Sequence, residues 1–260
     1  MLPTPQTVPV IGTDLAAVDY AAAVALARER AALGQQPFLI AAANTHLVTL
    51  ARHEPSFARS MTAFDLILPD GMPLVWAMNK RLASRLEDRV YGPTFMLRCL
   101  EATQGTGWSH AFVGGSEALL KKLRQQLLGL FPDLNISTMY SPPFGEWSSG
   151  EDRKITEQIT DSGANFVWIG LGCPKQERWL ASQKGNLPPA VYSAVGAAFA
   201  FHAGLTPQAP AWMQRTGLEW LFRLIAEPRR LIGRYVKFNS LFLFYMVAEG
   251  WRLRRFNKRS

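Results

Sequence analysis

The stretch that decides the fold is NFVWIGLGCPKQERWL, residues 165–180. Its first part, 165–172, has the continuous apolar character of a strand that is covered on both faces. Pro174 comes where the first turn of a helix tolerates a proline, and polar side chains follow it. Taken by itself, Gly-x-Gly is typical of an ordinary tight turn, so the neighbouring residues decide the interpretation. The whole stretch predicts a strand, a glycine turn and a helix at the carboxyl edge of a parallel sheet, where open α/β sheets bind ligands.

Most of the chain repeats this alternation of strand and helix. Short apolar segments predict the other strands, at 37–44, 65–71, 110–113, 135–145 and within 190–204. Amphipathic segments predict helices between them, at 15–34, 46–64, 73–81, 93–103, from Ser116 onward, and at 150–162. Such alternation is typical of an α/β domain with a doubly wound, mainly parallel, Rossmann-like sheet. We expect this domain to span residues 1–204.

The remaining residues, 205–260, have a different character. Tryptophan, phenylalanine and arginine are frequent there, and helical spacing replaces the strand pattern. Residues 1–222 carry 18 basic and 18 acidic side chains, whereas 223–260 carry ten basic and two acidic ones. The formal net charge of +8 therefore lies in the last part of the chain. The sequence predicts a basic, helical C-terminal appendage.

Basic helices with large apolar neighbours have two usual partners. Such helices lie on anionic membrane surfaces, and basic patches with aromatic side chains also bind nucleic acid. The segment LFLFYMVA, residues 241–248, is more apolar than a nucleic-acid-binding face requires. We therefore expect residues 223–260 to contact a membrane surface, and we expect no nucleic acid as a partner.

The composition indicates the cellular setting. Two cysteines, Cys99 and Cys173, are too few for a disulfide framework and lack metal-ligand spacing. The first fifteen residues lack the basic and apolar segments of a secretory signal. No stretch approaches the ~18 apolar residues of a membrane-spanning helix. These features predict a cytoplasmic protein.

Polar residues and glycines follow several of the predicted strands. They are Asn44, Thr45, Asp70, Gly114, Gly115, Gly172, Lys175, Gln176 and Glu177. Because parallel strands end at one edge of a sheet, we expect these residues to meet in a single cleft. Asp70 is the one carboxylate among them apart from Glu177, which falls in a helical turn. The local sequence around Asp70 is equally consistent with an aspartate that forms a turn and with a catalytic aspartate.

The glycine turns could bind a nucleotide. The turn before Ser116 opens a helix whose free N–H groups can bind phosphate or ribose, although neither Gly-x-Gly-x-x-Gly nor a Walker sequence is present. The chain also lacks Asp-x-Asp and paired histidines, so we expect no metal. Arginines would then have to balance the negative charge of a bound diphosphate. The candidates are Arg89, for which a surface ion pair with Glu87 or Asp88 is the alternative, and Arg223, Arg229, Arg230 and Arg234.

Taken together, these motifs resemble the bacterial WecG/TagA/CpsF family of glycosyltransferases, also called glycosyltransferase family 26. The resemblance covers roughly residues 10–240 in order. It rests on Asn44, LPDGMPLVWA (68–77), DRVYGP (88–93), FVGG (112–115), GLGCPKQERW (170–179), FHAG (201–204), the residues Ala209, Pro210 and Trp212, and GLEWLFRLIAEPRR (217–230).

The resemblance implies an activity and its partners. Members of the family transfer a sugar from a UDP-sugar to a sugar on a polyprenyl diphosphate, with inversion of the anomeric configuration. They act at the inner face of the cytoplasmic membrane, as peripheral proteins. Their products feed teichoic acids, enterobacterial common antigen or exopolysaccharides. Neither a metal nor another cofactor is expected.

The resemblance also implies roles for named residues. Asp70 is the catalytic base and Gln176 contacts the substrate, while Arg89 and the appendage arginines hold the diphosphate. The appendage closes over the site. These roles suit an inverting transfer, which needs a base for the acceptor hydroxyl, positive charge on the leaving group and polar groups on rigid strand ends. The other strand-end residues are expected to bind substrate.

Two positions depart from the family pattern. Ala42 stands where the family often has threonine, and Ala200 where it often has aspartate. Both changes could alter which sugar is recognised, so donor sugar, acceptor glycan and linkage are left open. A non-catalytic, nucleotide-sugar-binding regulator of a polysaccharide assembly complex is an alternative, against which the presence of Asp70 argues. A homo-oligomer is compatible with the sequence, although no residue argues for one.

Overall fold

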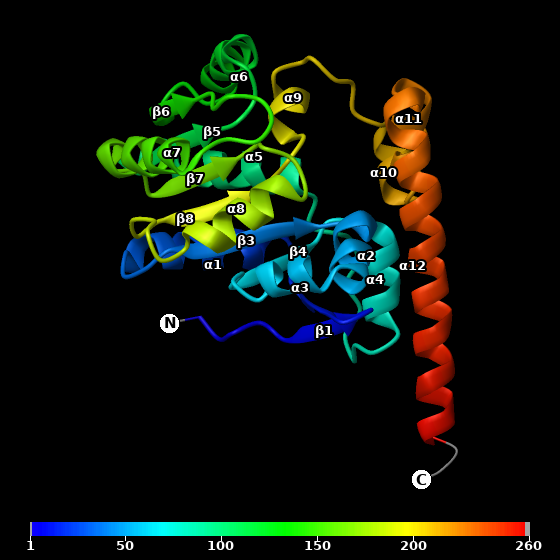
Figure 1. Cartoon of the computed structure of the whole chain (residues 1–260). Coiled ribbons are helices and arrows are strands. Elements are labelled where there is room, and N and C mark those ends of the chain that lie inside the picture. The colour runs from blue at the N-terminus through cyan, green and yellow to red at the C-terminus, as the bar shows by residue number, and fades with distance from the viewer. Residues whose placement is uncertain (1, 258–260) are drawn as a thin grey trace.

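The sheet has the predicted parallel arrangement. The computed structural model describes residues 2–257, without the side chains at positions 211, 230 and 250–257. Six parallel strands lie in the order β4-β3-β8-β7-β5-β6 (Figure 1). Their bounds are β3 Phe38–Ala43, β4 Leu66–Pro69, β5 Ser109–Val113, β6 Asn135–Tyr140, β7 Phe166–Ile169 and β8 Val191–Ala194.

The inner strands are apolar on both faces, which explains their continuous apolar sequence. In β7, Phe166 and Trp168 pack on one side of the sheet, and Val167 and Ile169 on the other. All four side chains are fully buried. This pattern requires helices on both faces.

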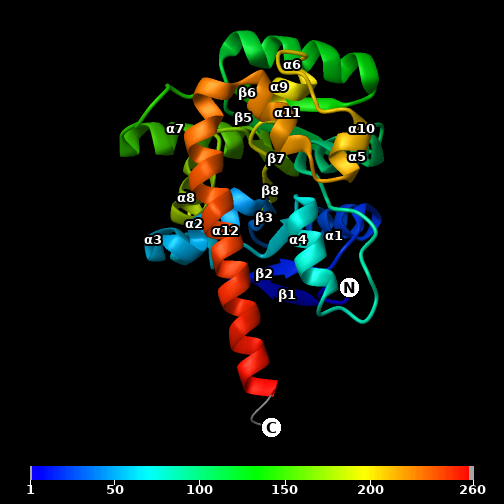
Figure 2. The same cartoon turned by 90° about the vertical axis from the view of Figure 1, so that its right-hand side faces the viewer.

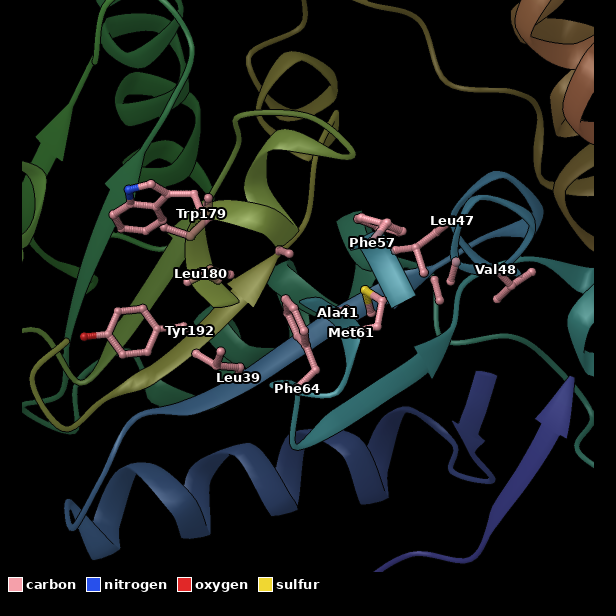
Figure 3. Close-up of a cluster of buried hydrophobic side chains, with 14 of the residues drawn as sticks. Leu39, Ala41, Leu47, Val48, Phe57, Met61, Phe64, Trp179, Leu180 and Tyr192 are labelled. Atoms are coloured by element: carbon pink, nitrogen blue, oxygen red, sulfur yellow. The ribbon is translucent and has the colours of Figure 1, made fainter. Parts of the chain in front are cut away.

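Helices do cover both faces, so the doubly wound fold is confirmed. One face packs against α2 Thr45–His53, α3 Pro55–Met61, α7 Ser149–Ser162 and α8 Lys175–Gln183. The other packs against α1 Tyr20–Leu33, α5 Gly92–Thr103, α6 Glu117–Leu130 and α9 Ala198–His202. Figure 3 shows the first of these cores, in which Leu39 and Tyr192 from the sheet lie near Leu180 of α8, and Phe57 of α3 lies near Leu47 of α2. Burying each such side chain contributes about 1.5–3 kcal/mol.

The N-terminal part differs from the sequence-based prediction of one helix over 15–34. Residues Thr7–Val10 and Thr13–Ala16 form β1 and β2, an antiparallel hairpin. Helix α1 begins only after Asp19, whose Oδ1 accepts a hydrogen bond of 2.8 Å from the Ala22 N–H. The prediction was wrong over 15–19 because Leu15 and Ala16 suit a buried strand as well as a helix.

Two smaller differences have local causes. The helix predicted at 46–64 is interrupted at Glu54, before Pro55, and becomes α2 and α3. Proline disfavours the helical conformation in the residue that precedes it. Residues after β8, predicted as a loop, include the short helix α9.

The C-terminal residues form helices α10 Ala211–Arg215, α11 Glu219–Ala226 and α12 Pro228–Asn257. Helix α12 has 30 residues and runs along one side of the molecule, next to α2 (Figures 1 and 2). Phe242 of α12 is buried in the core. The ring of Phe238, also on α12, meets the ring of His46 on α2 edge to face, with 4.4 Å between the ring centres. Near its far end, Glu249 pairs with Arg81 at 3.3 Å. Over the described residues, no helix is both long and apolar enough to cross a bilayer.

A buried histidine lies on β5, next to the edge strand β6. His110 on β5 is stacked against Phe166 and Trp168. Its Nδ1 accepts a hydrogen bond of 3.2 Å from Trp168 Nε1, so its proton lies on Nε2, 2.9 Å from the Thr103 hydroxyl oxygen. Burial lowers the pKa of His110 to about 3. The folded protein therefore keeps this ring neutral.

We predict that His110 makes the protein sensitive to acid. As pH falls from about 6.5 towards 3, the unfolded chain binds a proton that the folded state does not, so the free energy of unfolding decreases. His110→Phe should cost about 1–3 kcal/mol at neutral pH, because the Trp168 N–H loses its partner. The same variant should show a flatter dependence of stability on pH.

Urea unfolding between pH 4 and 7 measures this effect. The matched control is His53→Gln, at an exposed position. Equal pH dependence in wild type and His110→Phe would contradict the prediction.

Candidate active site

A cavity of about 960 Å³ opens at the carboxyl ends of β3, β4, β7 and β8. The chain continues from β3 to α2 on one face of the sheet, and from β8 to α9 on the other. Neighbouring strands whose connections diverge in this way leave a crevice between them. Helices α11 and α12, with α4 Met72–Asn79, form the outer wall of the cavity.

Asp70 lies in the wall of the cavity, directly after β4. Its backbone N–H donates to the Ala43 carbonyl at 2.8 Å, and its Oδ1 accepts from the Gly92 N–H at 2.9 Å. Burial raises the pKa of the carboxyl to about 7, with the guanidinium of Arg89 acting against this shift and the carboxylate of Glu219 adding to it. The side chain can therefore gain and lose a proton near neutral pH.

Arg89 is almost fully buried beside Asp70, with 7% of its surface exposed. Its Nη2 lies 2.5 Å from Glu219 Oε2 on α11, and its Nη1 donates to the Asp70 carbonyl at 3.2 Å. Its guanidinium also lies over the Tyr91 ring. Arg89 pairs with Glu219, and not with Glu87 or Asp88 as the alternative interpretation had it. Arg89 thus joins the loop of Asp70 to the C-terminal helices.

Gln176, at the start of α8, joins two of the strand ends. Its Oε1 accepts from the N–H groups of Gly172 at 3.1 Å and Gly196 at 3.2 Å. Its Nε2 donates to Glu177 Oε1 at 2.8 Å. Glu177 is buried, and this burial raises its pKa. Gln176 therefore links the turns after β7 and β8 at the floor of the cavity, and Glu177 orients its amide group.

The glycines predicted at the site differ in position. Gly115 and Gly172 line the cavity, whereas Gly114 does not. Gly114 has φ of +124°, and a Cβ there would lie 2.6 Å from the Gly170 carbonyl. This glycine allows the turns after β5 and β7 to pack closely.

The remaining strand-end residues separate into two groups. Asn44 and Thr45 line the cavity, and Asn44 Oδ1 also caps α2 by accepting from the Leu47 N–H at 3.1 Å. Lys175 lies outside the cavity lining. Its ammonium group donates to the Gly145 carbonyl and lies 3.4 Å from the centre of the Trp147 ring.

The appendage brings some of the predicted arginines to the cavity. Arg223 lines it and lies over the Phe201 ring, and its Nε has no hydrogen-bond partner among the described residues. Arg234 also lines the cavity. Arg229 is exposed and lies outside the lining. The side chain of Arg230 lies outside the described part of the structure, so its predicted role stays a prediction.

Sequence reasoning missed part of the outer wall. Among the residues that line it are Trp76, Lys80, Glu219, Trp220, Tyr235 and Asn239. The spacing of Met72, Trp76 and Lys80 by four residues marks one face of a helix, and Glu219 and Trp220 fall within a stretch already singled out. Ala42 and Ala200, the two departures, also line the cavity.

The electrostatics suit a reaction in which a negatively charged group leaves. A carboxylate that can accept a proton lies in the same cavity as the cations Arg223 and Arg234. Within the described residues, no three His, Cys, Asp or Glu side chains come together as ligands for a metal ion.

The fold and the site together have the features of a glycosyltransferase. Over residues 8–256, the chain matches the model of the Glycosyl transferase WecG/TagA/CpsF family, and it belongs to this family. One relative, from Bacillus subtilis, is 26% identical over 193 residues, which are 74% of this chain and 73% of the relative. Another, from Staphylococcus aureus, is 24% identical over 213 residues, 82% of this chain and 80% of the relative. Both are named N-acetylglucosaminyldiphosphoundecaprenol N-acetyl-beta-D-mannosaminyltransferase.

We predict that Glu219→Gln loosens the attachment of α11. The change leaves the buried Arg89 guanidinium without its charged partner, which costs about 3–5 kcal/mol. Part of this cost is avoided if α11 moves away and lets water reach Arg89. Limited proteolysis should then cut the connection at 203–218 faster than in wild type.

The control is Arg229→Gln, which changes an exposed charge on the next helix. Equal cleavage rates for wild type and Glu219→Gln would show that the ion pair does not hold α11 in place.

Proposed function

We propose that the protein transfers a sugar from a UDP-sugar to a saccharide on a polyprenyl diphosphate, with inversion at the anomeric carbon. The position and pKa of Asp70 carry this proposal, because an inverting transfer needs a base of about neutral pKa within the cavity. The names of the relatives support the acceptor class, since each specifies a sugar on diphosphoundecaprenol. The product would serve cell-surface polysaccharide or teichoic acid synthesis.

Asp70 acts on the acceptor in this mechanism. Its carboxylate takes the proton of the acceptor hydroxyl while that oxygen forms a bond to the anomeric carbon. The bond from the anomeric carbon to the UDP oxygen breaks on the opposite side, and UDP leaves with the electron pair. Because the configuration inverts in one displacement, one carboxylate suffices.

The cations of the cavity act on the diphosphates. Arg223 and Arg234 belong to the appendage, whereas Asp70 belongs to the sheet edge. The Arg89–Glu219 pair therefore positions the appendage cations as well as the loop of the base. Positive charge fixed in this way stabilises negative charge that develops as UDP leaves. We propose that no metal ion is needed.

Helix α12 is proposed to contact the membrane that carries the acceptor. Its outer surface exposes Ile232, Val236, Phe244 and Val247, and the segment from 223 onward is basic. This combination is typical of helices that lie in the interface of anionic bilayers. The contact would place the protein on the inner face of the cytoplasmic membrane.

The first test is UDP release with Asp70→Asn. Wild type should release UDP only when both a suitable UDP-sugar and a polyprenyl-diphosphate sugar are present, with EDTA in the buffer. Asp70→Asn should lower kcat/KM at least about 100-fold, while the control Asp14→Asn, an exposed change on β2, should leave it unchanged. Loss of turnover in EDTA, with recovery on adding a divalent ion, would contradict metal independence.

The same assay separates the two functional classes. Binding of UDP-sugars without transfer to any of a varied set of acceptors would contradict the proposal and favour the non-catalytic regulator.

We also predict opposite effects of pH on activity and stability at Asp70. Because the carboxyl must be ionised to act as a base, kcat/KM should fall as pH decreases through about 7. The unfolded chain ionises this carboxyl from about pH 3.8, whereas the folded state holds its proton until about pH 7, so stability falls over this window and stays lower at pH 8. Asp70→Asn should therefore melt at or above the wild-type temperature at pH 8, and a lower melting temperature there would contradict this.

A further inference from the structure

The cavity continues as an apolar trough between α4 and α12. It is lined by Met72 and Trp76 of α4 and by Lys80 at the C-cap of that helix, and along α12 by Tyr235, Asn239, Phe242, Leu243 and Met246. Each set recurs at three or four residues and so belongs to one face of its helix. From Arg234 to Met246 the α12 wall is about 18 Å long, at 1.5 Å per residue.

The two helices run in the same direction, away from the base. Helix α4 begins two residues after Asp70, and it packs against the β1 strand of the N-terminal hairpin. Helix α12 begins beside α11 and reaches the same hairpin, where Glu249 Oε2 accepts from the Ile11 N–H at 3.3 Å. Figure 2 shows both helices descending towards the hairpin. The trough therefore leads from the candidate active site to the far half of α12.

The side chains along this path change in character. Asp70 and Arg223 lie at the inner end, and Arg234 follows at the start of the α12 wall. Beyond them the lining is mainly aromatic and aliphatic. This order, from base to cations to apolar surface, matches the order of groups in a sugar linked through diphosphate to an isoprenoid chain.

We propose that this trough binds the sugar-proximal isoprene units of the lipid-linked acceptor. The proposal rests on the function proposed above and adds a site for the hydrocarbon part of the substrate. Continuity with the site argues for the acceptor chain over a partner protein, because a chain joined to the diphosphate must leave the cavity by some route. The trough also meets the exposed apolar surface of α12, where Leu243 is 64% and Phe244 65% exposed.

Leu243 and Phe244 provide a matched pair of variants. They are adjacent and equally exposed, but Leu243 lines the trough and Phe244 does not. Both Leu243→Glu and Phe244→Glu add one negative charge to α12, so effects on general membrane attraction should be similar. A specific effect on the trough should appear only with Leu243→Glu.

Kinetics in detergent, without a bilayer, test the trough directly. Two acceptors carry the same sugar diphosphate, one on a long isoprenoid chain and one on a short, water-soluble alkyl chain. For the long chain, Leu243→Glu should raise KM about tenfold, as expected when about two methylenes lose their apolar contact. Its KM for the short chain, and both values for Phe244→Glu, should stay near wild type.

Outcomes for this proposal and for the function itself are distinguishable. Transfer to the short-chain acceptor by wild type tests the function alone, and its absence together with absence of long-chain transfer would overturn both. Equal wild-type KM values for the two chains, or equal increases for the two variants, would overturn the trough while leaving the function intact.

Photo-crosslinking adds a readout that does not require turnover. The probe is a short isoprenyl diphosphate with a diazirine at its tail end. Labelling should map to the α4 and α12 residues of the trough, including Trp76 and Met246, and should weaken in Leu243→Glu but not in Phe244→Glu. Labelling confined to the outer surface of α12, or to other parts of the chain, would overturn the proposal.

Discussion

The buried ion pair between Arg89 and Glu219 is the contact on which the site depends. It joins the loop that carries Asp70 to α11, and Arg89 also binds the Asp70 carbonyl. Arg89 lowers the pKa of the Asp70 carboxyl and Glu219 raises it, so burial remains the main reason why this pKa is raised. Since a buried pair of this kind is costly to break, the appendage is held where its own arginines reach the cavity. Base and cations thus come from different parts of the chain and are positioned by one interaction.

Much of the fold could be predicted because the inner strands are apolar on both faces, as in Phe166–Ile169 of β7. A continuous apolar run followed by a glycine turn has few other interpretations in a chain of this length. The N-terminal hairpin could not be predicted in the same way. Leu15 and Ala16 are compatible with either element, and their pairing with β1 depends on tertiary contacts.

The rule that parallel strands end at one edge of a sheet predicted a single cavity for Asn44, Asp70 and Gln176, and all three line it in the structure. It misplaced Lys175, since the direction of a side chain in the first turn of a helix depends on details that the local pattern does not contain. It also could not identify the partner of Arg89, which lies 130 residues further along the chain. The part of the cavity wall that α12 contributes could not be predicted from the sequence, for a related reason. Helical spacing marks the faces of α12, but only packing decides which face meets α4.

The central claim is that Asp70 is a base kept near neutral pKa by its surroundings. The most direct measurement is an NMR titration of its side-chain carboxyl in the full-length protein with ¹³C-labelled aspartate, assigned by comparison with Asp70→Asn. The account predicts a midpoint of about 7. A midpoint near the ordinary aspartate value of 3.8 would contradict it, because the carboxyl would then be an ordinary solvated group rather than a base set by burial.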